Sequence, residues 1–433
     1  MINRELYMKR IRPFIGREII KVLTGIRRSG KSVMLSLIQE ELRKQGVSDE
    51  QMISFNFEQL VNRTYCNALA LHEEISRRAR GKTGKLYFFF DEIQEVEDWQ
   101  RCINSLRLDF DCDIYVTGSN AKLLSGELAT YLAGRYVEFV MYPFSFAEFI
   151  AMQQEEGLYL SEGKAFQDYL LTGGMPFLSH LPKEEDAIFQ YLRDVYHSVI
   201  LKDVIGRNAI RDVDLLERIV LYLMANVGHP FSVNSLTKYF KNEKRNTSYE
   251  TVLNYVKVCE NAFLLYRVKR EDLVGKKSLS VNEKLYVVDH GIRQAVYGRN
   301  QQDIDQVLEN IVCLEMLRRG YAVTVGKYGD KEIDFIAARG KEKLYVQVTY
   351  LLASEQTMER EFGVLEEIRD NYPKYVVSLD EFDRGRNGIR HRNIRDFFCK
   401  NRGHKKRVCQ LFDRLFFQSG ERSTADVRHP GKR

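Results

Sequence analysis

The sequence predicts an α/β protein that begins with a parallel sheet covered by helices on both faces. Its first 151 residues alternate short apolar runs with helical patterns, as strands joined by crossover helices do. One apolar run leads into a glycine-rich turn, and another ends in two adjacent acids. At 433 residues the chain is too long for one ordinary core, so two or three domains are expected.

The elements of the first domain, residues 1–151, follow from residue patterns. Strands are expected at 18–24, 52–57, 86–90 and 113–117, and helices at 31–45 and 69–80. The run 86–90 consists only of apolar residues with a strong preference for strands, so it is expected to be buried on both faces. A parallel sheet follows from this alternation.

The remaining chain divides into four further segments. Residues 152–212 predict a helical lid or connector, and residues 213–288 fit a winged helix with helices at 215–225, 232–240 and 246–261. Thr247 and Glu250 have capping-box spacing at the start of the third helix. Residues 289–400 return to a mixed α/β pattern, and 401–433 form a basic tail expected to be disordered or peripheral.

The charge is unevenly distributed. The net charge is +6, and the tail alone carries nine basic and three acidic residues, so residues 1–400 sum to zero. A globally basic nucleic-acid-binding body is therefore excluded, and any such surface must be a local patch.

The sequence predicts a cytoplasmic protein that does not contact a membrane. Its start is rich in Arg, Lys and Glu, unlike a signal peptide, and its most apolar long stretch carries Arg135, Glu138 and Glu148. The seven cysteines lack a C-x-x-C pair and are expected to be buried free thiols. The eight histidines show no metal-ligand spacing.

The glycine-rich turn fits the phosphate-loop pattern G-x-x-x-x-G-K-[ST], directly after a predicted strand and at the start of a predicted helix. Its glycines let backbone N–H groups point at phosphates, and the helix dipole adds to this. Lys31 would bridge the β- and γ-phosphates, and the Ser32 hydroxyl would ligate Mg²⁺. The alternative is an ordinary glycine-containing turn. The predicted nucleotide contacts are Gly25, Ile26, Arg27, Arg28, Ser29, Gly30, Lys31, Ser32 and Val33.

The two acids that end the apolar run 86–90 supply the second half of the predicted site. Asp91 would hold the Mg²⁺ shell, and Glu92 would polarise the attacking water. A lone charged strand end is common, but one that follows an unbroken apolar strand downstream of a phosphate loop favours catalysis. The adjacent pair therefore predicts hydrolysis as well as binding.

Two further catalytic candidates follow. After the strand at 113–117, a polar side chain could sense the γ-phosphate; Asn120 is preferred over Ser119, although such residues also form turns. Arg135 could act as an arginine finger on a neighbouring subunit, which would require a homo-oligomer. The alternative for Arg135 is a surface ion pair with Glu138 or a helix cap.

These motifs resemble the prokaryotic AAA-type ATPases, and more narrowly the archaeal-ATPase-like branch with a C-terminal domain of unknown function. The residues concerned are the Walker A run 24–32, the Walker B run 90–94 with Trp99, and the runs 117–120 and 132–135. The resemblance covers residues 1–400 and is most specific over 18–150. It implies an ASCE-type nucleotide fold, Mg²⁺-ATP as ligand, a winged helix and a C-terminal module similar to PD-(D/E)xK nucleases.

The nuclease-like module departs from that pattern. Glu309 and Glu315 lie on a predicted helix, and Asp334 stands where the first metal-binding carboxylate belongs. However, Gln347 and Thr349 occupy the E-x-K positions, so one metal ligand and the lysine are missing. The expected outcome is a retained fold without cleavage, unless Glu309 or a partner restores the metal site.

The third winged-helix helix offers few groups for reading DNA. Asn254 and Lys257 lie on it, and Lys241, Lys244 and Arg245 precede it. These suffice for phosphate contacts but not for sequence recognition, and winged helices also dock proteins, so both roles stay open.

The function expected from the sequence is Mg²⁺-dependent ATP binding and hydrolysis coupled to a conformational change in the winged-helix and nuclease-like segments. One alternative is an ATP-gated nucleic-acid nuclease, which Gln347 and Thr349 argue against. Another is a nucleotide-switched protein-binding scaffold, in which Glu92 would have no evident purpose. The protein partners are not identified by the sequence.

Overall fold

The computed structural model describes residues 2–124, 132, 134–208, 210–245, 247–275 and 277–398. The predicted basic tail, 401–433, lies outside these residues, as do Cys399 and Cys409.

The amino-terminal part contains a five-stranded sheet in which every neighbouring pair is parallel, in the order β2-β3-β4-β1-β5. The strands are β1 (Ile20–Thr24), β2 (Met52–Asn56), β3 (Leu86–Asp91), β4 (Cys112–Gly118) and β5 (Tyr136–Val140). Strands β1, β3 and β4 are buried at every position, because they lie inside the sheet with both faces covered. The predicted parallel sheet is confirmed.

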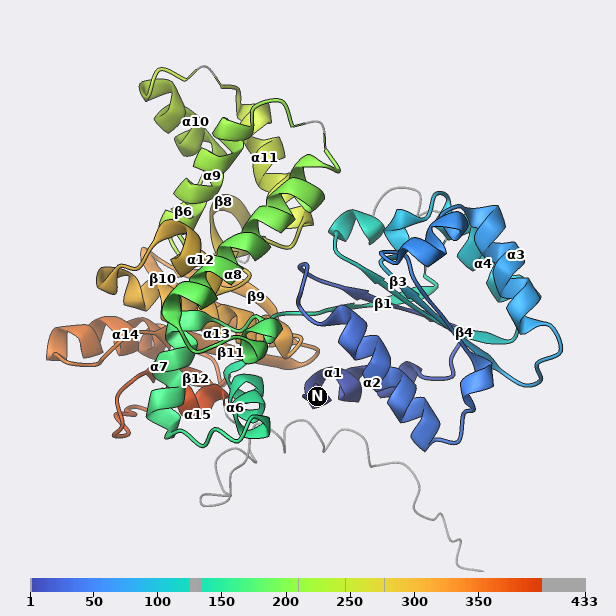
Figure 1. Ribbon diagram of the computed structural model, residues 1–433. Helices are drawn as coiled ribbons and strands as arrows, with labels where there is room; N and C mark the ends of the chain where they lie inside the picture. Colours follow the sequence, from blue (N-terminus) through green and yellow to red (C-terminus); the bar gives the residue numbers. More distant parts are fainter. Residues whose placement is uncertain are drawn as a thin grey trace, which may run out of the picture.

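Four helices cover this sheet (Figure 1). Helices α1 (Glu5–Ile11) and α2 (Lys31–Lys44) lie on one face, and α3 (Ala68–Ala79) and α4 (Trp99–Asp109) lie on the other. The apolar run of β3 serves both faces: Phe88 and Phe90 join the core under α3 and α4, whereas Phe89 joins the core under α2. The unbroken apolar pattern is thus explained by a strand that needs two apolar faces.

A helical segment follows the sheet. It contains α6 (Phe146–Glu155), α7 (Glu162–Thr172), α8 (Glu185–Ser198) and a π-helical turn, η7 (Val199–Ile205), which continues directly from α8. The helical structure is interrupted between α7 and α8 at Gly173 and Gly174. A β-carbon on Gly174 would lie 2.2 Å from the Phe144 carbonyl oxygen, so only glycine fits there.

The next segment has the element order expected of a winged helix. It contains α9 (Val213–Ala225), β6 (Pro230–Phe231), α10 (Val233–Asn242), α11 (Tyr249–Asn261), β7 (Leu265–Asp272) and β8 (Lys277–Val287). The predicted cap of the third helix is wrong in position. Ser248 caps α11 by accepting the Thr251 N–H, whereas the Thr247 side chain is buried.

The remaining elements are helices and strands of the carboxyl-terminal part. They are α12 (His290–Tyr297), α13 (Ile304–Arg318), β9 (Ala322–Tyr328), β10 (Lys331–Arg339), β11 (Glu342–Val348), α14 (Glu355–Glu367), β12 (Lys374–Ser378), β13 (Arg390–Asn393) and α15 (Ile394–Phe398).

One eight-stranded mixed sheet spans both carboxyl-terminal segments, in the order β13-β12-β11-β10-β9-β7-β8-β6. The join is the parallel pair β7–β9, in which Arg270 lies beside Val325. The boundary expected at residues 288/289 therefore does not separate two sheets.

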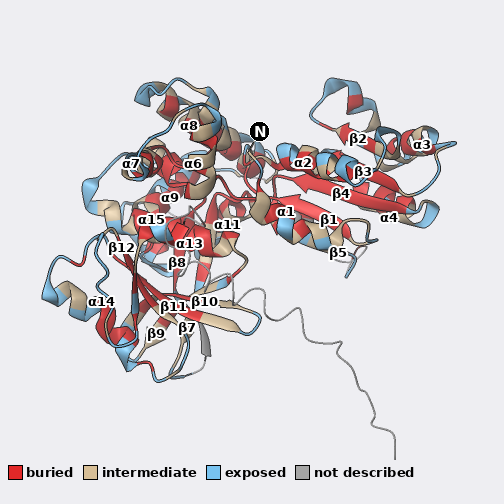
Figure 2. Cartoon of the chain, turned by 90° about the horizontal axis from the view of Figure 1, so that it is seen from below, coloured by how far each residue is buried: buried red, intermediate tan, exposed pale blue. Residues whose placement is uncertain are grey.

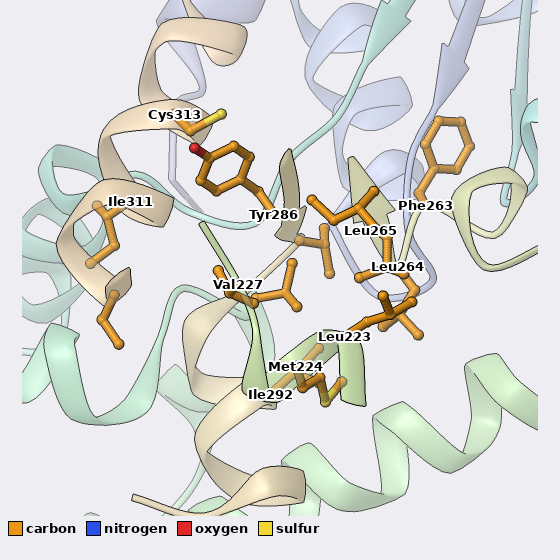
Figure 3. Close-up of a cluster of buried hydrophobic side chains, with 14 of the residues drawn as sticks. Leu223, Met224, Val227, Phe263, Leu264, Leu265, Tyr286, Ile292, Ile311 and Cys313 are labelled. Carbon is orange, nitrogen blue, oxygen red and sulfur yellow. The ribbon is translucent and has the colours of Figure 1, made fainter. Parts of the chain in front are cut away.

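A shared apolar core accompanies this sheet (Figure 3). Leu223 and Met224 of α9, Tyr286 of β8, Ile292 of α12 and Cys313 of α13 belong to one buried cluster. Figure 2 shows the inner strands buried and the outer faces of the helices exposed. The segments 213–288 and 289–398 are thus joined by packing as well as by hydrogen bonds.

The five described cysteines are free thiols, and the expected burial holds for four of them. Cys102, Cys112, Cys259 and Cys313 are buried, and Cys66 is half-buried. None of the helices in the described ranges combines the length and apolarity that crossing a membrane requires.

A buried ion pair lies at the centre of the first sheet. Lys21 on β1 donates to Asp113 on β4, and both side chains are 0% exposed. Asp113 also accepts the Gly16 N–H at 2.7 Å and the Tyr115 hydroxyl at 2.8 Å. The pair therefore ties two central strands to the segment that precedes them.

We expect Asp113→Ala to destabilise this part of the protein by about 3–5 kcal/mol, because it leaves the Lys21 ammonium buried without its counter-charge. The single tryptophan, Trp99, is 5% exposed and packs on the same sheet, so its fluorescence during urea unfolding reports on this region. The control is Lys85→Ala, which removes a surface pair with Asp111 and should cost about 1 kcal/mol or less. Equal losses for both variants would contradict a structural role for the buried pair.

Candidate functional site

The phosphate loop joins the end of β1 to the start of α2. Gly25 has φ +139°, and a β-carbon there would lie 2.2 Å from the Met141 carbonyl oxygen. Gly30 has φ +93° and immediately precedes Lys31, the first residue of α2. Both positions thus need glycine, one for space and the other for its left-handed backbone. The loop geometry accounts for the glycines of the motif.

Lys31 turns its ammonium back into this loop. Its Nζ donates to the carbonyl oxygens of Gly25 at 3.1 Å and Ile26 at 3.2 Å, and it lies 3.4 Å from the Glu92 carboxylate. The residue is only 5% exposed. A buried cation therefore faces the acidic end of β3.

Asp91 lies at that end, between three polar side chains. Its carboxylate accepts hydrogen bonds from the hydroxyls of Ser32 and Thr117 and from the Asn56 amide, the last at 3.0 Å. Burial raises the pKa of Asp91, and the bonds from Ser32 and Thr117 oppose this rise. The two predicted Mg²⁺ ligands, Ser32 and Asp91, are thus brought together.

Glu92 occupies a left-handed backbone position, φ +55°, and its N–H donates to the Thr117 hydroxyl at 2.9 Å. Burial would raise the pKa of its carboxyl, but the Lys31 ammonium and a hydrogen bond from Gln94 outweigh burial and hold the pKa below its usual value. Glu92 is therefore ionised at neutral pH. Thr117, which the sequence did not single out, supports both acids.

The two sensor candidates both reach the same region. The Ser119 hydroxyl donates to an oxygen of Asp203 at 3.0 Å, and it lies near enough to Glu92 to help lower the pKa of that carboxyl. The Asn120 amide donates to the backbone carbonyl of Asp203 at 3.4 Å. Both candidates, Asn120 as well as Ser119, thus contact Asp203.

Asp203 is a site residue that sequence reasoning missed. It lies on the π-helical turn η7, is 0% exposed and accepts two hydrogen bonds from Arg27 of the phosphate loop, at 3.0 and 3.3 Å. In the sequence, Asp203 is marked only as an acid that, with Lys202, interrupts the otherwise apolar residues 199–205. Nothing local in the sequence joins residue 203 to residue 27.

Arg135 lies at the opposite end of the sheet from the loop. Strand β5 runs parallel to β1, with Tyr136 beside Ile20 and Val140 beside Thr24. At about 3.3 Å per residue, Arg135 is roughly 15 Å from the loop edge, which excludes contact with its own site. It donates to Asn104 at 3.2 Å, whereas Glu138 accepts from Thr24. Of the alternatives for Arg135, the ion pair with Glu138 is therefore not formed.

The predicted nuclease-like positions form a second polar cluster. The Gln347 side chain accepts the Asp334 N–H at 2.7 Å and donates to Glu361 at 3.0 Å. Lys284 of β8 donates to Glu309 and Glu332, both at 2.9 Å. Within the described ranges, no three His, Cys, Asp or Glu side chains are placed to share a metal ion.

Other members of this module behave differently. Burial and the nearby Glu309 raise the pKa of Asp334 well above its usual value. Glu315 does not belong to the cluster, because its carboxylate pairs with Arg318 and Arg319 of its own helix. Thr349 is buried and donates its N–H to the Val377 carbonyl.

The five residues near α11 that were considered for DNA contact differ in exposure. Lys241, Lys244, Asn254 and Lys257 are exposed. Arg245 forms an ion pair with Asp214 at the start of α9. Four of the five residues proposed for phosphate contact are thus accessible.

Two family models match the chain. Residues 17–150 match a family described as an AAA domain, and residues 163–303 match a domain of unknown function, DUF8612. The first match contains the phosphate loop, Asp91, Glu92 and the whole five-stranded sheet. Residues 17–150 therefore form an AAA-type P-loop domain.

Two curated proteins match most of the chain. An uncharacterized protein of Haemophilus influenzae is 39% identical over 378 residues, covering 87% of this chain and 93% of that protein. An uncharacterized protein of Methanocaldococcus jannaschii is 30% identical over 383 residues, covering 84% and 81%. Among solved structures, the Walker-type ATPase PABY2304 of Pyrococcus abyssi is similar with a TM-score of 0.49 and 12% identity, over 68% of this chain and 96% of that one.

Proposed function

The chain belongs to the same protein family as these Haemophilus and Methanocaldococcus relatives, and from its AAA-type domain we propose that it is a Mg²⁺-dependent ATPase. One observation carries the proposal: the Lys31 ammonium lies 3.4 Å from Glu92, and beside them the Ser32 hydroxyl is near enough to Asp91 to lower its pKa. A cation, a water-polarising carboxylate and two oxygen ligands thus converge at one loop. This is the set that phosphoryl transfer to water needs.

The residues present suit ATP and Mg²⁺. The buried Ser29 hydroxyl has no hydrogen-bond partner within the described chain, and Lys31 is a buried donor, so phosphate oxygens would satisfy both. Ser32 and Asp91 provide oxygen ligands of the kind Mg²⁺ prefers. Bound Mg²⁺ would neutralise charge on the phosphates. Of the other predicted contacts, Arg28 lies in the loop itself, and the exposed Val33 lies in the first turn of α2.

Glu92 would act on the attacking water. Its depressed pKa keeps the carboxylate ionised, so it can accept a hydrogen bond from water and orient it. The Gln94 amide and the Thr117 hydroxyl hold its side chain and backbone respectively. A scaffold that only bound nucleotide would not need this carboxylate to be held in place.

We propose that hydrolysis moves the segments beyond the AAA domain. In this proposal residues 1–151 are the ATPase domain, 152–212 the connector, 213–288 a winged helix and 289–400 a nuclease-like module. Ser119 and Asn120 are the candidates that sense the nucleotide. The free thiols of the described residues fit a cytoplasmic location.

The exposed Lys241, Lys244 and Lys257 support weak contact of the winged-helix segment with DNA phosphates. Cleavage is not proposed, because the Gln347 amide, bonded to Glu361 and to the Asp334 backbone, takes the place of a metal-binding carboxylate. Lys284 is an ammonium in this cluster, but Glu309 and Glu332 already pair with it.

We expect Glu92→Gln to bind ATP and to hydrolyse it about 10²–10⁴-fold more slowly than wild type, because it removes the water-polarising charge and keeps the shape. Phosphate release and binding of a fluorescent ATP analogue measure the two effects, each with and without double-stranded DNA. The matched control is Glu97→Gln, a nearby exposed acid, which should turn over like wild type. If Glu92→Gln hydrolysed ATP as fast as wild type, Glu92 would not be the catalytic residue.

We also expect Arg135 to act on a neighbouring subunit in a homo-oligomer, since its own site is out of reach. Arg135→Ala and Lys31→Ala should each be inactive, and mixing them should restore hydrolysis, because the Lys31→Ala subunit still supplies an arginine to its neighbour. Arg101→Ala, which changes another exposed arginine, is the control and should stay active. Absence of recovery in mixtures that do co-assemble would rule out the trans role.

For the carboxyl-terminal part we expect salt-dependent binding of duplex DNA without cleavage. Lys257→Ala should reduce the slope of log affinity against log salt by about 1, measured by fluorescence anisotropy. A duplex incubated with Mg²⁺ should remain intact for wild type and for Asp334→Ala. Mg²⁺-dependent cleavage that Asp334→Ala abolishes would instead show that the protein is a nuclease. Binding whose affinity does not depend on salt would contradict the proposed contacts with DNA phosphates.

A further inference from the structure

Asp203 is a carboxylate from outside the AAA domain that reaches the proposed ATP site. It lies on the π-helical turn η7, about sixty residues beyond β5, yet its side chain contacts the phosphate loop. It accepts from Arg27 through both Nε and Nη2, at 3.0 and 3.3 Å. It is fully buried, so these donors replace the water that would otherwise solvate it.

The same carboxylate also reaches the sensor strand. Ser119 donates to Asp203 at 3.0 Å, and the same hydroxyl lies near enough to Glu92 to help lower the pKa of that carboxyl. A hydroxyl carries one hydrogen, so it can donate to only one carboxylate at a time. The state of Asp203 is therefore linked, through one side chain, to the group proposed to orient water.

The Arg27 guanidinium, likewise, can be contested by two anions. Arg27 is a residue of the phosphate loop, and its side chain is 12% exposed between Asp203 and Glu58. A γ-phosphate in the loop is an anion that competes with Asp203 for the same guanidinium. ADP lacks that phosphate and competes less. The contact between Arg27 and Asp203 is thus sensitive to which nucleotide is bound.

We propose that Asp203 is a positioning residue that couples the proposed ATP site to the helical segment: it holds Arg27 and Ser119, and it yields Arg27 to the γ-phosphate when ATP binds. This inference rests on the proposed ATPase function and adds to it the residue through which the nucleotide acts on the rest of the chain.

The surroundings of Asp203 fit a coupling element. Val199, Ile200 and Val204 of the same turn pack in one apolar cluster with Ile26 of the phosphate loop. The turn has π-helical hydrogen bonding, in which the Gly206 N–H donates to the Leu201 carbonyl at 2.9 Å. Such turns are rare and frequently lie at functional sites. A change at Arg27 is therefore passed to α8 on one side and towards α9 on the other.

The test compares wild type with Asp203→Asn, which keeps the shape of the side chain and removes its charge. We expect Asp203→Asn to bind a non-hydrolysable ATP analogue about tenfold more tightly, because Glu58 is then the only one of the two carboxylates that still competes for Arg27, and to bind ADP with little change. We expect its kcat to fall about tenfold or more, because a neutral amide oxygen holds the Ser119 hydroxyl less firmly than the Asp203 carboxylate does. In wild type the ATP analogue, and not ADP, should speed amide hydrogen exchange in residues 199–206; in Asp203→Asn exchange should be fast with either nucleotide.

The control is Glu185→Gln, which removes an exposed ion pair with Arg299 at the start of α8 and leaves the pairs of Asp203 with Arg27 and Arg207 in place. It should behave like wild type in all three measurements. If Asp203→Asn fails to fold, judged by Trp99 fluorescence, Arg27→Lys tests the same contact from the loop side. Arg27→Lys loses the two-nitrogen contact, so it should also lose the difference in exchange between ATP and ADP.

The outcomes separate the two proposals. Wild-type binding, kcat and exchange in Asp203→Asn would overturn the role of Asp203 while the ATPase stands. A wild-type chain that binds the ATP analogue without turning over would overturn hydrolysis, and the exchange comparison would still decide the role of Asp203. A wild-type chain that binds no nucleotide would overturn both.

Discussion

A buried ammonium beside two buried carboxylates, at one edge of a parallel sheet, is the arrangement on which the first domain depends. Charges can be buried there because Lys31, Asp91 and Glu92 compensate one another and because Ser32, Thr117 and Gln94 complete their hydrogen bonds. These charged side chains are held in place by rigid strands. Strand β3 is accordingly apolar from Leu86 to Phe90 and packed on both faces.

Much of this domain could be predicted from sequence because its signals are local. The phosphate loop, the strand that ends in Asp91 and Glu92, and the alternation of strands and helices are each contained in a few adjacent residues. Thr117 escaped notice because a threonine within an apolar strand looks like any β-former. Asp203 escaped because its partners, Arg27 and Ser119, are far away in sequence and are brought to it by the tertiary fold alone.

The carboxyl-terminal half was harder to divide for the same reason. The order of elements between α9 and β8 agreed with expectation, yet the parallel pairing of β7 with β9 merges two expected domains into one sheet. Such pairing has no signature in the paired residues themselves. Likewise, the absence of an E-x-K lysine was visible in the sequence, whereas the lysine that stands among the acids, Lys284, comes from a strand assigned to a different segment.

The position of Ile26 has a consequence for how such a protein can change over evolution. This loop residue is buried in the apolar cluster of the carboxyl-terminal segments, and Leu314 of α13 is buried in the cluster beneath α2. Each half therefore supplies part of the other's interior. A recombination that joined the AAA domain to a new carboxyl-terminal half would have to rebuild both contacts at once. The two halves are therefore constrained to be inherited together.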